Sequence, residues 1–313
     1  MGKALSVKTR PFAWPDIEAI ARLHRASEQI DHAGRLCDAF SLQERWQRPG
    51  IVPERECLVA VAQGSVIGYA LRSHGDGASQ CLVDGVVHPS WRRLGVGRRL
   101  FREIGDQARL AGANTLDIRV RDDEPAANAF CRSLGLRAVR TWHRMWSQPL
   151  HLIPFVFPSG YSWRTFQLRR DEGTHANIVN DTLTDHWGAG PVTLESVRYL
   201  VAQPTFEPGN ILFATRGSEV VGVCAVRFLD REVGGRHYST GHIGPVGVRA
   251  GHRGLGLGHA LLAGAIRQCL RRRIQAAELD VDETNAPAIH VYRDCGFETL
   301  FRILWYRQEL ASD

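Results

Sequence analysis

The sequence lacks the features that mark membrane and secreted proteins. No apolar run in the 313 residues approaches the ~20 residues that a membrane-spanning helix needs. The N-terminal stretch MGKALSVKTR has no apolar centre of the kind that a signal peptide carries. The composition, 44% hydrophobic and 23% charged, is ordinary for a globular enzyme. We therefore expect a cytoplasmic protein that does not contact a membrane.

Cysteine is present, but not in a pattern that binds metal or forms a disulfide framework. The seven cysteines are an odd number, and no two of them have Cys-x-x-Cys spacing. Disulfide frameworks use even sets of cysteines, and structural zinc sites use closely spaced pairs. We therefore predict buried, reduced thiols and no metal site.

The C-terminal half has no net charge. The formal net charge is +6, and residues 1–150 hold all of it, with 22 basic and 16 acidic residues against 17 of each in the remainder. A basic half can indicate nucleic-acid binding. Its arginines, however, crowd one glycine-rich turn and the helix behind it, so a phosphorylated cofactor is the simpler partner and no nucleic acid is expected. These arginines are Arg92, Arg93, Arg98, Arg99 and Arg102.

The most informative stretch is a second glycine-rich turn, in the C-terminal half. It follows an apolar segment and precedes a helical one. Three glycines let such a turn expose several backbone N–H groups at the start of a helix, where the helix dipole favours phosphate. The spacing therefore predicts an anion-binding turn, and a purely structural loop is the alternative. Its residues are Arg253, Gly254, Leu255, Gly256, Leu257, Gly258 and His259.

The two turns belong to a tandem repeat. Arg253 follows Arg92 by 161 residues, and this offset continues without a gap to the end of the repeat. Upstream the offset is 154 residues, as between Gly68 and Gly222. Two copies of roughly 150 residues each match the usual size of a domain. The earlier strand and turn that correspond to the later ones contain Gly85, Val86, Val87, Arg92, Arg93, Leu94, Gly95, Val96, Gly97 and Arg98.

We therefore expect two domains, residues 1–148 and 160–313. The linker between them, 149–159, is rich in proline but also in Leu, Ile and Phe, so we expect it to pack between the domains. In both copies the hydrophobic pattern alternates between strand and helix periods, which indicates a mixed α/β class. Residues 233–241 are predicted as a glycine-rich turn. A chain with two copies is compatible with a monomer or a homodimer.

These residues, in this order, resemble the GCN5-related N-acetyltransferase (GNAT) superfamily. Its signature is an Arg/Gln-x-x-Gly-x-Gly/Ala turn after a central strand, followed by Asn…Ala…Tyr…Gly-Phe. The resemblance implies, for each copy, a mostly antiparallel mixed sheet that is splayed at the cofactor strand and flanked by helices, with acetyl-CoA as donor. Two copies, with Asp185, His186 and Trp187 early in the second, resemble the mycothiol synthase type. The second copy carries the whole signature as Arg253, Gly256, Gly258, Asn285, Ala288, Tyr292, Gly296 and Phe297.

The resemblance also implies roles for residues of the second copy. Tyr292 stands where family enzymes hold a tyrosine with its hydroxyl near the cofactor sulfur, so it is the candidate acid; a core aromatic is the alternative. The backbone of Val246, Gly247 and Val248 would pair with the acetyl-pantetheine arm, at a bulge that Gly247 suits. Asn285 belongs to the same cofactor site.

The candidate base is His242. Enzymes of the mycothiol type tend to place a glutamate near the start of the central strand, and His242 occupies that position here. Histidine is suited to removing a proton near neutral pH. A surface histidine is the alternative, and Asp185 and His186 are rival bases or, with Trp187, substrate contacts. The change from glutamate leaves open whether the acceptor is the mycothiol precursor.

The first copy keeps the turn but not the candidate acid. Cys131 stands at the position of Tyr292 and Glu124 at that of Asn285. Because a thiol does not reach as far as a phenol hydroxyl, we expect the chemistry to take place in the C-terminal domain. The expected reaction is transfer of an acetyl group from acetyl-CoA to a small-molecule amine. The alternatives are transfer to a protein amino group and a non-catalytic module that senses CoA or binds nucleic acid.

Overall fold

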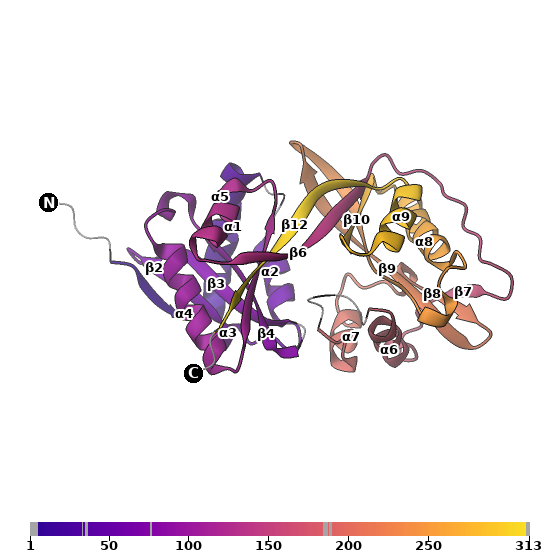
Figure 1. Cartoon of the computed structure of the whole chain (residues 1–313), viewed down its shortest axis with the longest axis horizontal. Coiled ribbons are helices and arrows are strands. Elements are labelled where there is room, and N and C mark those ends of the chain that lie inside the picture. The colour runs from indigo at the N-terminus through magenta and orange to yellow at the C-terminus, as the bar shows by residue number, and fades with distance from the viewer. Residues whose placement is uncertain are drawn as a thin grey trace. The chain divides into compact units, whose positions relative to one another are not determined.

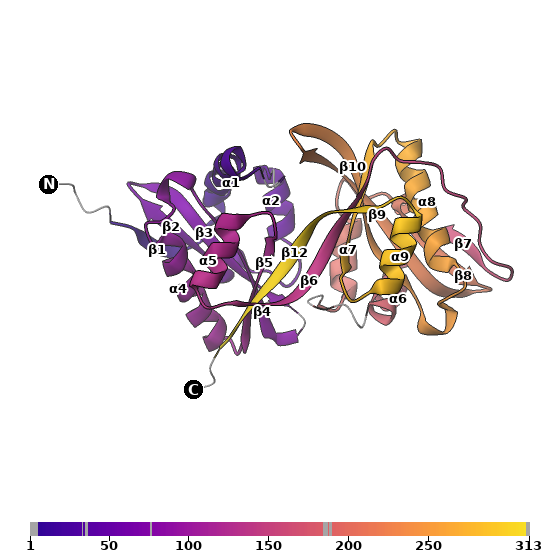
Figure 2. The same cartoon turned by 45° about the horizontal axis from the view of Figure 1, so that its top comes forward.

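The computed structural model describes residues 6–32, 34, 37–75, 77–183, 187 and 190–310. They form two compact units, here called the N-terminal unit and the C-terminal unit, whose helices and strands are traced in Figures 1 and 2. Each unit includes a terminal strand segment from the other copy of the repeat. Of the described residues, those within 6–140, 190 and 304–310 belong to the N-terminal unit, and those within 141–187 and 191–303 to the C-terminal unit.

The N-terminal unit is a mixed sheet with helices on both faces. Its strand order is β1-β2-β3-β4-β5-β12; strands β1 to β4 pair antiparallel, whereas β4 and β5 are parallel. Helices α4 and α5 cover one face and α1 and α2 the other. The elements are β1 (Lys8–Pro11), α1 (Ile17–Asp31), α2 (Ala39–Trp46), α3 (Pro53–Glu56), β2 (Cys57–Ala62), β3 (Ser65–Gly75), β4 (Gly77–Val87), α4 (Val96–Leu110), β5 (Thr115–Arg121), α5 (Pro125–Ser133), β6 (Arg137–Ser147) and β12 (Glu298–Glu309).

The C-terminal unit repeats this plan. Its strand order is β7-β8-β9-β10-β11-β6, and the pairs are antiparallel except for β10 and β11, which are parallel. The predicted α/β class with a mixed sheet is confirmed in both units. The elements are β7 (Ser162–Thr165), α6 (Glu172–Thr182), α7 (Leu194–Val201), β8 (Ile211–Arg216), β9 (Glu219–Val233), β10 (Arg236–Val248), α8 (Leu257–Arg271), β11 (Ala276–Asp282) and α9 (Ala286–Asp294).

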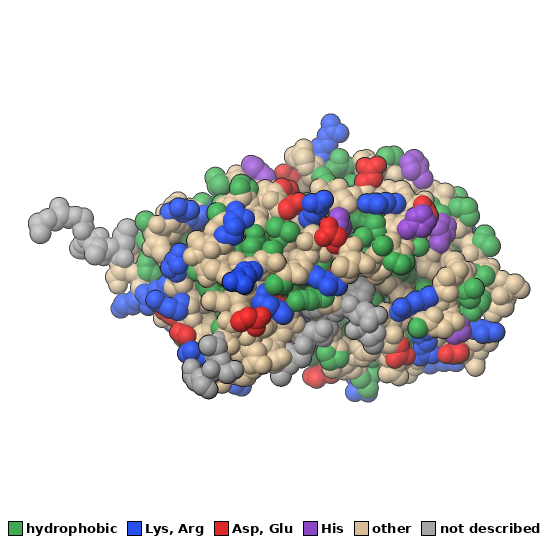
Figure 3. Space-filling view, in the orientation of Figure 1, with side chains coloured by type: hydrophobic (Ala, Val, Ile, Leu, Met, Phe, Trp, Pro, Cys, Tyr) green, Lys and Arg blue, Asp and Glu red, His purple; other side chains and the backbone are tan. Residues whose placement is uncertain are grey.

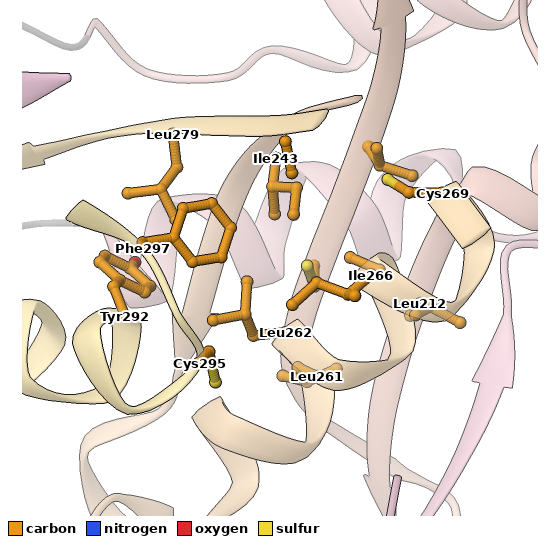
Figure 4. Packing of buried hydrophobic residues seen from close by; sticks show 14 of the residues in the cluster. Leu212, Ile243, Leu261, Leu262, Ile266, Cys269, Leu279, Tyr292, Cys295 and Phe297 are labelled. Carbon is orange, nitrogen blue, oxygen red and sulfur yellow. The ribbon is translucent and has the colours of Figure 1, made fainter. Parts of the chain in front are cut away.

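Strand alternation divides the core of the C-terminal unit into two layers. Leu212 and Ala214 of β8 belong to the cluster under α8 and α9, whereas Ile211 and Phe213 belong to the cluster under α6. Figure 4 shows the first cluster, with side chains of α8 packed against the strands and Phe297 beside Tyr292. Each strand residue can therefore be assigned to one face, which locates the site residues below.

The segment predicted as a long glycine-rich turn is a hairpin. Strands β9 and β10 pair up to Val233 and Arg236, so the turn consists of Gly234 and Gly235 alone. Both glycines have positive φ, 58° and 74°, as a two-residue hairpin turn requires. The prediction of a turn over 233–241 was wrong because the end of this hairpin is largely solvent-exposed and its polar residues hide the strand pattern.

The apolar linker packs on the C-terminal unit. Leu150, Ile153 and Phe157 lie against the cluster under α8 and α9. The Phe155 ring covers Gly264 of α8, where a Cβ would come 2.7 Å from the ring. These contacts with one core account for the apolar composition of the segment.

The described helices include none that is both long and apolar enough to cross a membrane. All seven cysteines are free, and six of them are buried. Within the same described ranges, no group of three or more His, Cys, Asp and Glu side chains is arranged to hold a metal ion. On the face drawn in Figure 3, arginine and lysine side chains are dispersed among acidic and apolar ones.

Candidate active site

The predicted anion turn of the C-terminal unit leads directly into α8. Gly254 and Gly256 have φ values of 75° and 83°, and Gly256 is the N-cap of the helix without a side-chain hydrogen bond. A Cβ on Gly258 would meet no atom within 4 Å, so the first turn of α8 is open. The amides at this helix start, together with the helix dipole, form the kind of site that binds phosphate.

Arg253 supplies a positive charge beside these amides. Its Nε donates to the Val248 carbonyl at 2.9 Å, which fixes the guanidinium next to the end of β10. No residue in the described ranges hydrogen-bonds or ion-pairs with its two terminal nitrogens. The guanidinium is therefore oriented by the backbone, and its outer edge remains available for an anion.

Strands β10 and β11 separate just before the turn. They pair in parallel only from Thr240–His242 with Ala276–Glu278, and β10 then continues to Val248. The register of β10 against β9 shifts between Ile243 and Val246, so the bulge lies at Gly244–Pro245 rather than at the predicted Gly247. Glycine is needed at position 247 for a different reason, because a Cβ there would collide with the Thr182 side chain of α6. The separation leaves one edge of Val246–Val248 without a strand partner.

His242 stands at the last paired position before the strands separate. Its Nδ1 lies 3.0 Å from Oε1 of Glu278, the residue opposite it on β11. Glu278 is 2% exposed. Arg144 and Arg231 form ion pairs with the same carboxylate at 2.9 and 2.8 Å.

Glu278 is ionised at this site. Burial opposes its ionisation, but hydrogen bonds from His242 and Arg231 and the positive charge of Arg144 hold the pKa of this carboxyl well below its usual range. An ionised carboxylate only accepts hydrogen bonds, so we assign the imidazole proton to Nδ1. In the neutral form of the ring, Nε2 of His242 then carries the lone pair. This nitrogen lies 3.9 Å from the position that a Cβ on Gly244 would take, at the bulge where the strands separate.

Glu278 was missed in the sequence. It lies within an otherwise apolar run of β11, and a lone acidic residue in a buried strand was the available signal. Its partnership with His242 depends on the register of two strands that are far apart in sequence, which no local pattern specifies.

Tyr292 lies in the core on the opposite face of the sheet from His242. It is 8% exposed and its ring centroid is 6.4 Å from that of Phe297. Burial raises the pKa of Tyr292, so the phenol keeps its proton at neutral pH. Asn285, predicted to contact the cofactor, caps α9 by accepting a hydrogen bond from the Ala288 amide at 3.2 Å.

A cavity of about 270 Å³ lies between α6, α7 and the bulge of β10. Ile243 faces α8, so His242 on the preceding residue faces the α6 side, where this cavity lies. Of the predicted substrate contacts, Trp187 is partly buried, whereas Asp185 and His186 lie outside the described residues. The apolar residues that line the cavity are Val179, Leu183, Val192, Val197, Leu200 and Pro245.

The N-terminal unit keeps the turn but pairs its charge internally. Gly95 has the same φ of 83° as Gly256, and Arg92 donates from Nε to the Val87 carbonyl at 3.1 Å. The terminal nitrogens of Arg92, however, both bond the Asp31 carboxylate at 2.7 Å. The predicted residues lie at the end of β4 (Gly85, Val86, Val87), in the turn (Arg92, Arg93, Leu94, Gly95) and in the first turn of α4 (Val96, Gly97, Arg98).

The first turn of α4 is also less open than that of α8. A Cβ on Gly97 would come 3.3 Å from the Phe130 ring. Leu82 stands opposite Asp117 as His242 stands opposite Glu278. Burial raises the pKa of the Cys131 thiol, which replaces Tyr292, to about 12. The positions of His242 and Tyr292 therefore hold neither an imidazole nor a phenol in the N-terminal unit.

Comparison with known proteins identifies the family of the chain. The acetyltransferase (GNAT) family matches residues 17–136 and 176–297, one match for each copy. The chain belongs to this family, and it is an acetyltransferase with two tandem GNAT domains. The resemblance to this superfamily and to its tandem type is confirmed.

The chain is similar over most of its length to several individual acetyltransferases. The chain is 30% identical over 301 residues to a mycothiol acetyltransferase of Streptomyces bingchenggensis, covering 93% of this chain and 92% of the relative. It is 29% identical over 292 residues to a mycothiol acetyltransferase of Thermomonospora curvata, covering 90% of each. A crystal structure of a GCN5-related N-acetyltransferase from Sphaerobacter thermophilus, 27% identical, matches with a TM-score of 0.75 over 97% of this chain and 95% of that one.

A second solved structure shows the likeness of fold alone. A tandem GNAT protein from the clavulanic acid biosynthesis pathway matches with a TM-score of 0.76 at 20% identity, over 98% of this chain and 100% of that one.

Proposed function

We propose that this acetyltransferase moves the acetyl group of acetyl-CoA to the amine of a small molecule, and that its C-terminal unit performs the chemistry. The observation that carries the proposal is the pairing of His242 with the buried, ionised Glu278 at the point where β10 and β11 separate. The relatives named mycothiol acetyltransferase support a small-molecule acceptor. The cytoplasmic location and the monomeric or homodimeric state stay predictions.

The residues present fit a CoA thioester. The amides of Leu257, Gly258 and His259 and the outer edge of Arg253 would hold the diphosphate, because this guanidinium has no partner in the described ranges there. The free edge of Val246–Val248 would hold the pantetheine amides by hydrogen bonds of the strand type. Acetyl-CoA supplies an acetyl group activated as a thioester.

His242 and Tyr292 would handle the two protons. His242 Nε2 takes the proton that the amine loses as its nitrogen bonds the acetyl carbon, and the Glu278 carboxylate stabilises the imidazolium. Tyr292 Oη gives its proton to the sulfur as the carbon–sulfur bond breaks. General-base and general-acid steps are typically worth about 10²–10⁴ in rate each.

Substitution of His242 tests the proposal. We expect H242Q to lower kcat by about 10²–10⁴, because glutamine cannot accept the proton, while the affinity for acetyl-CoA stays within about threefold. The measurement is thiol release from acetyl-CoA with a panel of amines, with mass spectrometry of the acetylated product. His237 on the same strand is solvent-exposed, so H237Q is the matched control. Equal kcat for H242Q and H237Q would remove His242 from the mechanism.

A further inference from the structure

The cavity beside the bulge is placed to hold part of the acceptor. Pro245, which lines it, follows His242 by three residues on the same strand. His242 and the cavity lie on the same face of the sheet, the face covered by α6 and α7. An amine that reaches His242 Nε2 from this face has the cavity beside it. The volume, about 270 Å³, suits one compact group rather than a long chain.

The described lining has no charged side chain. Besides six apolar residues it has two polar ones, His175 and Ser196. Ser196 is occupied, since its hydroxyl donates to the Thr193 carbonyl at 2.8 Å and accepts from the Thr193 amide at 3.1 Å. His175 is 4% exposed, and its Nδ1 has no hydrogen-bond partner in the described part of the chain. Burial lowers the pKa of His175 to about 4, so the ring is neutral near pH 7.

Two positions of this lining match charged residues in the N-terminal unit. The N-caps Asp38 and Thr193 align α2 with α7, which puts Arg45 at the position of Leu200. The repeat offset puts Asp84 at the position of Pro245. Arg45 and Asp84 form an ion pair at 3.9 Å. The fold therefore accepts charged residues here, and the apolar lining is a property of the C-terminal unit.

Aligning helices α1 and α6 by their N-caps gives the same contrast between polar and apolar positions. Aligning Asp16 with Asp171 puts His24 at the position of Val179 and Glu28 at that of Leu183. His24 hydrogen-bonds the Tyr69 hydroxyl at 2.9 Å. Four positions of the lining, those of Val179, Leu183, Leu200 and Pro245, are thus apolar in the C-terminal unit and polar in the N-terminal unit, whereas His175 matches the apolar Ile20.

We propose that the acceptor is a primary amine carrying a compact apolar group, and that this group occupies the cavity. The cavity favours such an acceptor because burying apolar surface is favourable, whereas a hydroxyl group that replaces water at the apolar lining gains no hydrogen-bond partner from that lining. The inference rests on the proposed acetyl transfer and names the class of its acceptor.

The test compares primary amines of opposite polarity. With the full-length protein and saturating acetyl-CoA, we expect kcat/KM for isoamylamine and phenethylamine to exceed that for glucosamine by at least about tenfold. A higher value for glucosamine would overturn the inference while leaving acetyl transfer intact. Acetyl-CoA binding without acetylation of any amine would overturn both the inference and the proposed function.

Two substitutions at Leu200 locate the effect in the cavity. L200R introduces the residue of the N-terminal unit and should lower kcat/KM for phenethylamine at least tenfold, mainly through KM, with unchanged acetyl-CoA affinity. L200A enlarges the cavity and should shift the preference from isoamylamine toward phenethylamine, which keeps the test decisive if L200R does not fold. Leu194, at the start of the same helix, is 41% exposed, so L194R is the control. Equal kcat/KM for L200A and L194R with both amines would overturn the inference.

Discussion

The two units are built on one plan and differ in the groups around it. Both have a parallel strand pair of three residues that then separates, and both enter a helix through a glycine at φ 83°. In the C-terminal unit a histidine and an ionised glutamate meet at the separation. In the N-terminal unit the same positions hold Leu82 and Asp117. The strand and turn geometry is thus the same in both units, and the units differ in a few side chains, among them the proposed base His242.

The buried carboxylates show the contrast most clearly. Asp117 is fully buried, and Arg307 donates two hydrogen bonds of 2.8 Å to it, with Gln80 as a further partner. Glu278 has two arginines and, in addition, His242. A carboxylate in this position thus holds a strand by an ion pair in both units. Only in the C-terminal unit does it also bond an imidazole.

Among the substitutions that compare the two units, removing the phenol should have the largest effect on activity. Tyr292→Phe removes only the hydroxyl, so kcat should fall by about 10²–10⁴ with nearly unchanged acetyl-CoA affinity. Steady-state thiol release and calorimetric titration measure the two quantities. The control is Tyr306→Phe in the N-terminal unit, whose hydroxyl donates to Asn128 at 3.0 Å. If Y292F and Y306F have the same kcat, the comparison between Tyr292 and Cys131 loses its functional meaning.

Breaking the ion pair of the N-terminal unit should affect stability and not chemistry. Asp117→Asn leaves Arg307 without its counter-charge, and such a change costs about 3–5 kcal/mol of unfolding free energy. Urea denaturation measures the loss. The activity per folded molecule should be that of the unaltered protein. A kcat that falls with this substitution would place part of the chemistry in the N-terminal unit.

His175 should make the C-terminal unit sensitive to acid. Its pKa in the folded unit is about 4, below the ordinary value of 6.5. Between these values the unfolded chain binds more protons, so stability falls as pH drops from about 6.5 to about 4 and then stays level, a loss on the order of 3 kcal/mol. His175→Ile, which introduces the matching Ile20, should remove this slope. The measurement is the unfolding free energy at pH 7, 5.5 and 4.5. The same dependence on pH in H175I and in the unaltered protein would contradict this role of His175.

The two turn arginines should differ in their effect on donor affinity. Arg253→Ala should weaken acetyl-CoA binding by about 1.5–3 kcal/mol, about 10- to 150-fold, the usual worth of a hydrogen bond to a charged group. Arg92→Ala should change it less than threefold, because Asp31 already occupies that guanidinium. Calorimetric titration of each variant with acetyl-CoA measures the two affinities. A larger loss for R92A than for R253A would reverse the assignment of the donor site.

The features of the fold and site that the sequence could predict are those set by residues close together in the chain. The glycine turns, the repeat and the helix starts are local, and the sequence predicted them. The hairpin at Gly234 was missed because the strand ends next to its turn are partly exposed and polar. The bulge at Gly244–Pro245, the contact of Gly247 with Thr182 and the bond between His242 and Glu278 depend on how separate elements pack. No pattern in a single stretch specifies such contacts.

The most direct test of the account is a double-substitution cycle on His242 and Glu278. The measurement is kcat at saturating acetyl-CoA and amine for H242Q, E278Q and the combination of the two. If the residues act as one proton-accepting unit, E278Q lowers kcat, and the combined variant loses no more than H242Q alone. Losses that multiply would show that the two residues act independently, and a combined variant with full kcat would contradict catalysis by this pair.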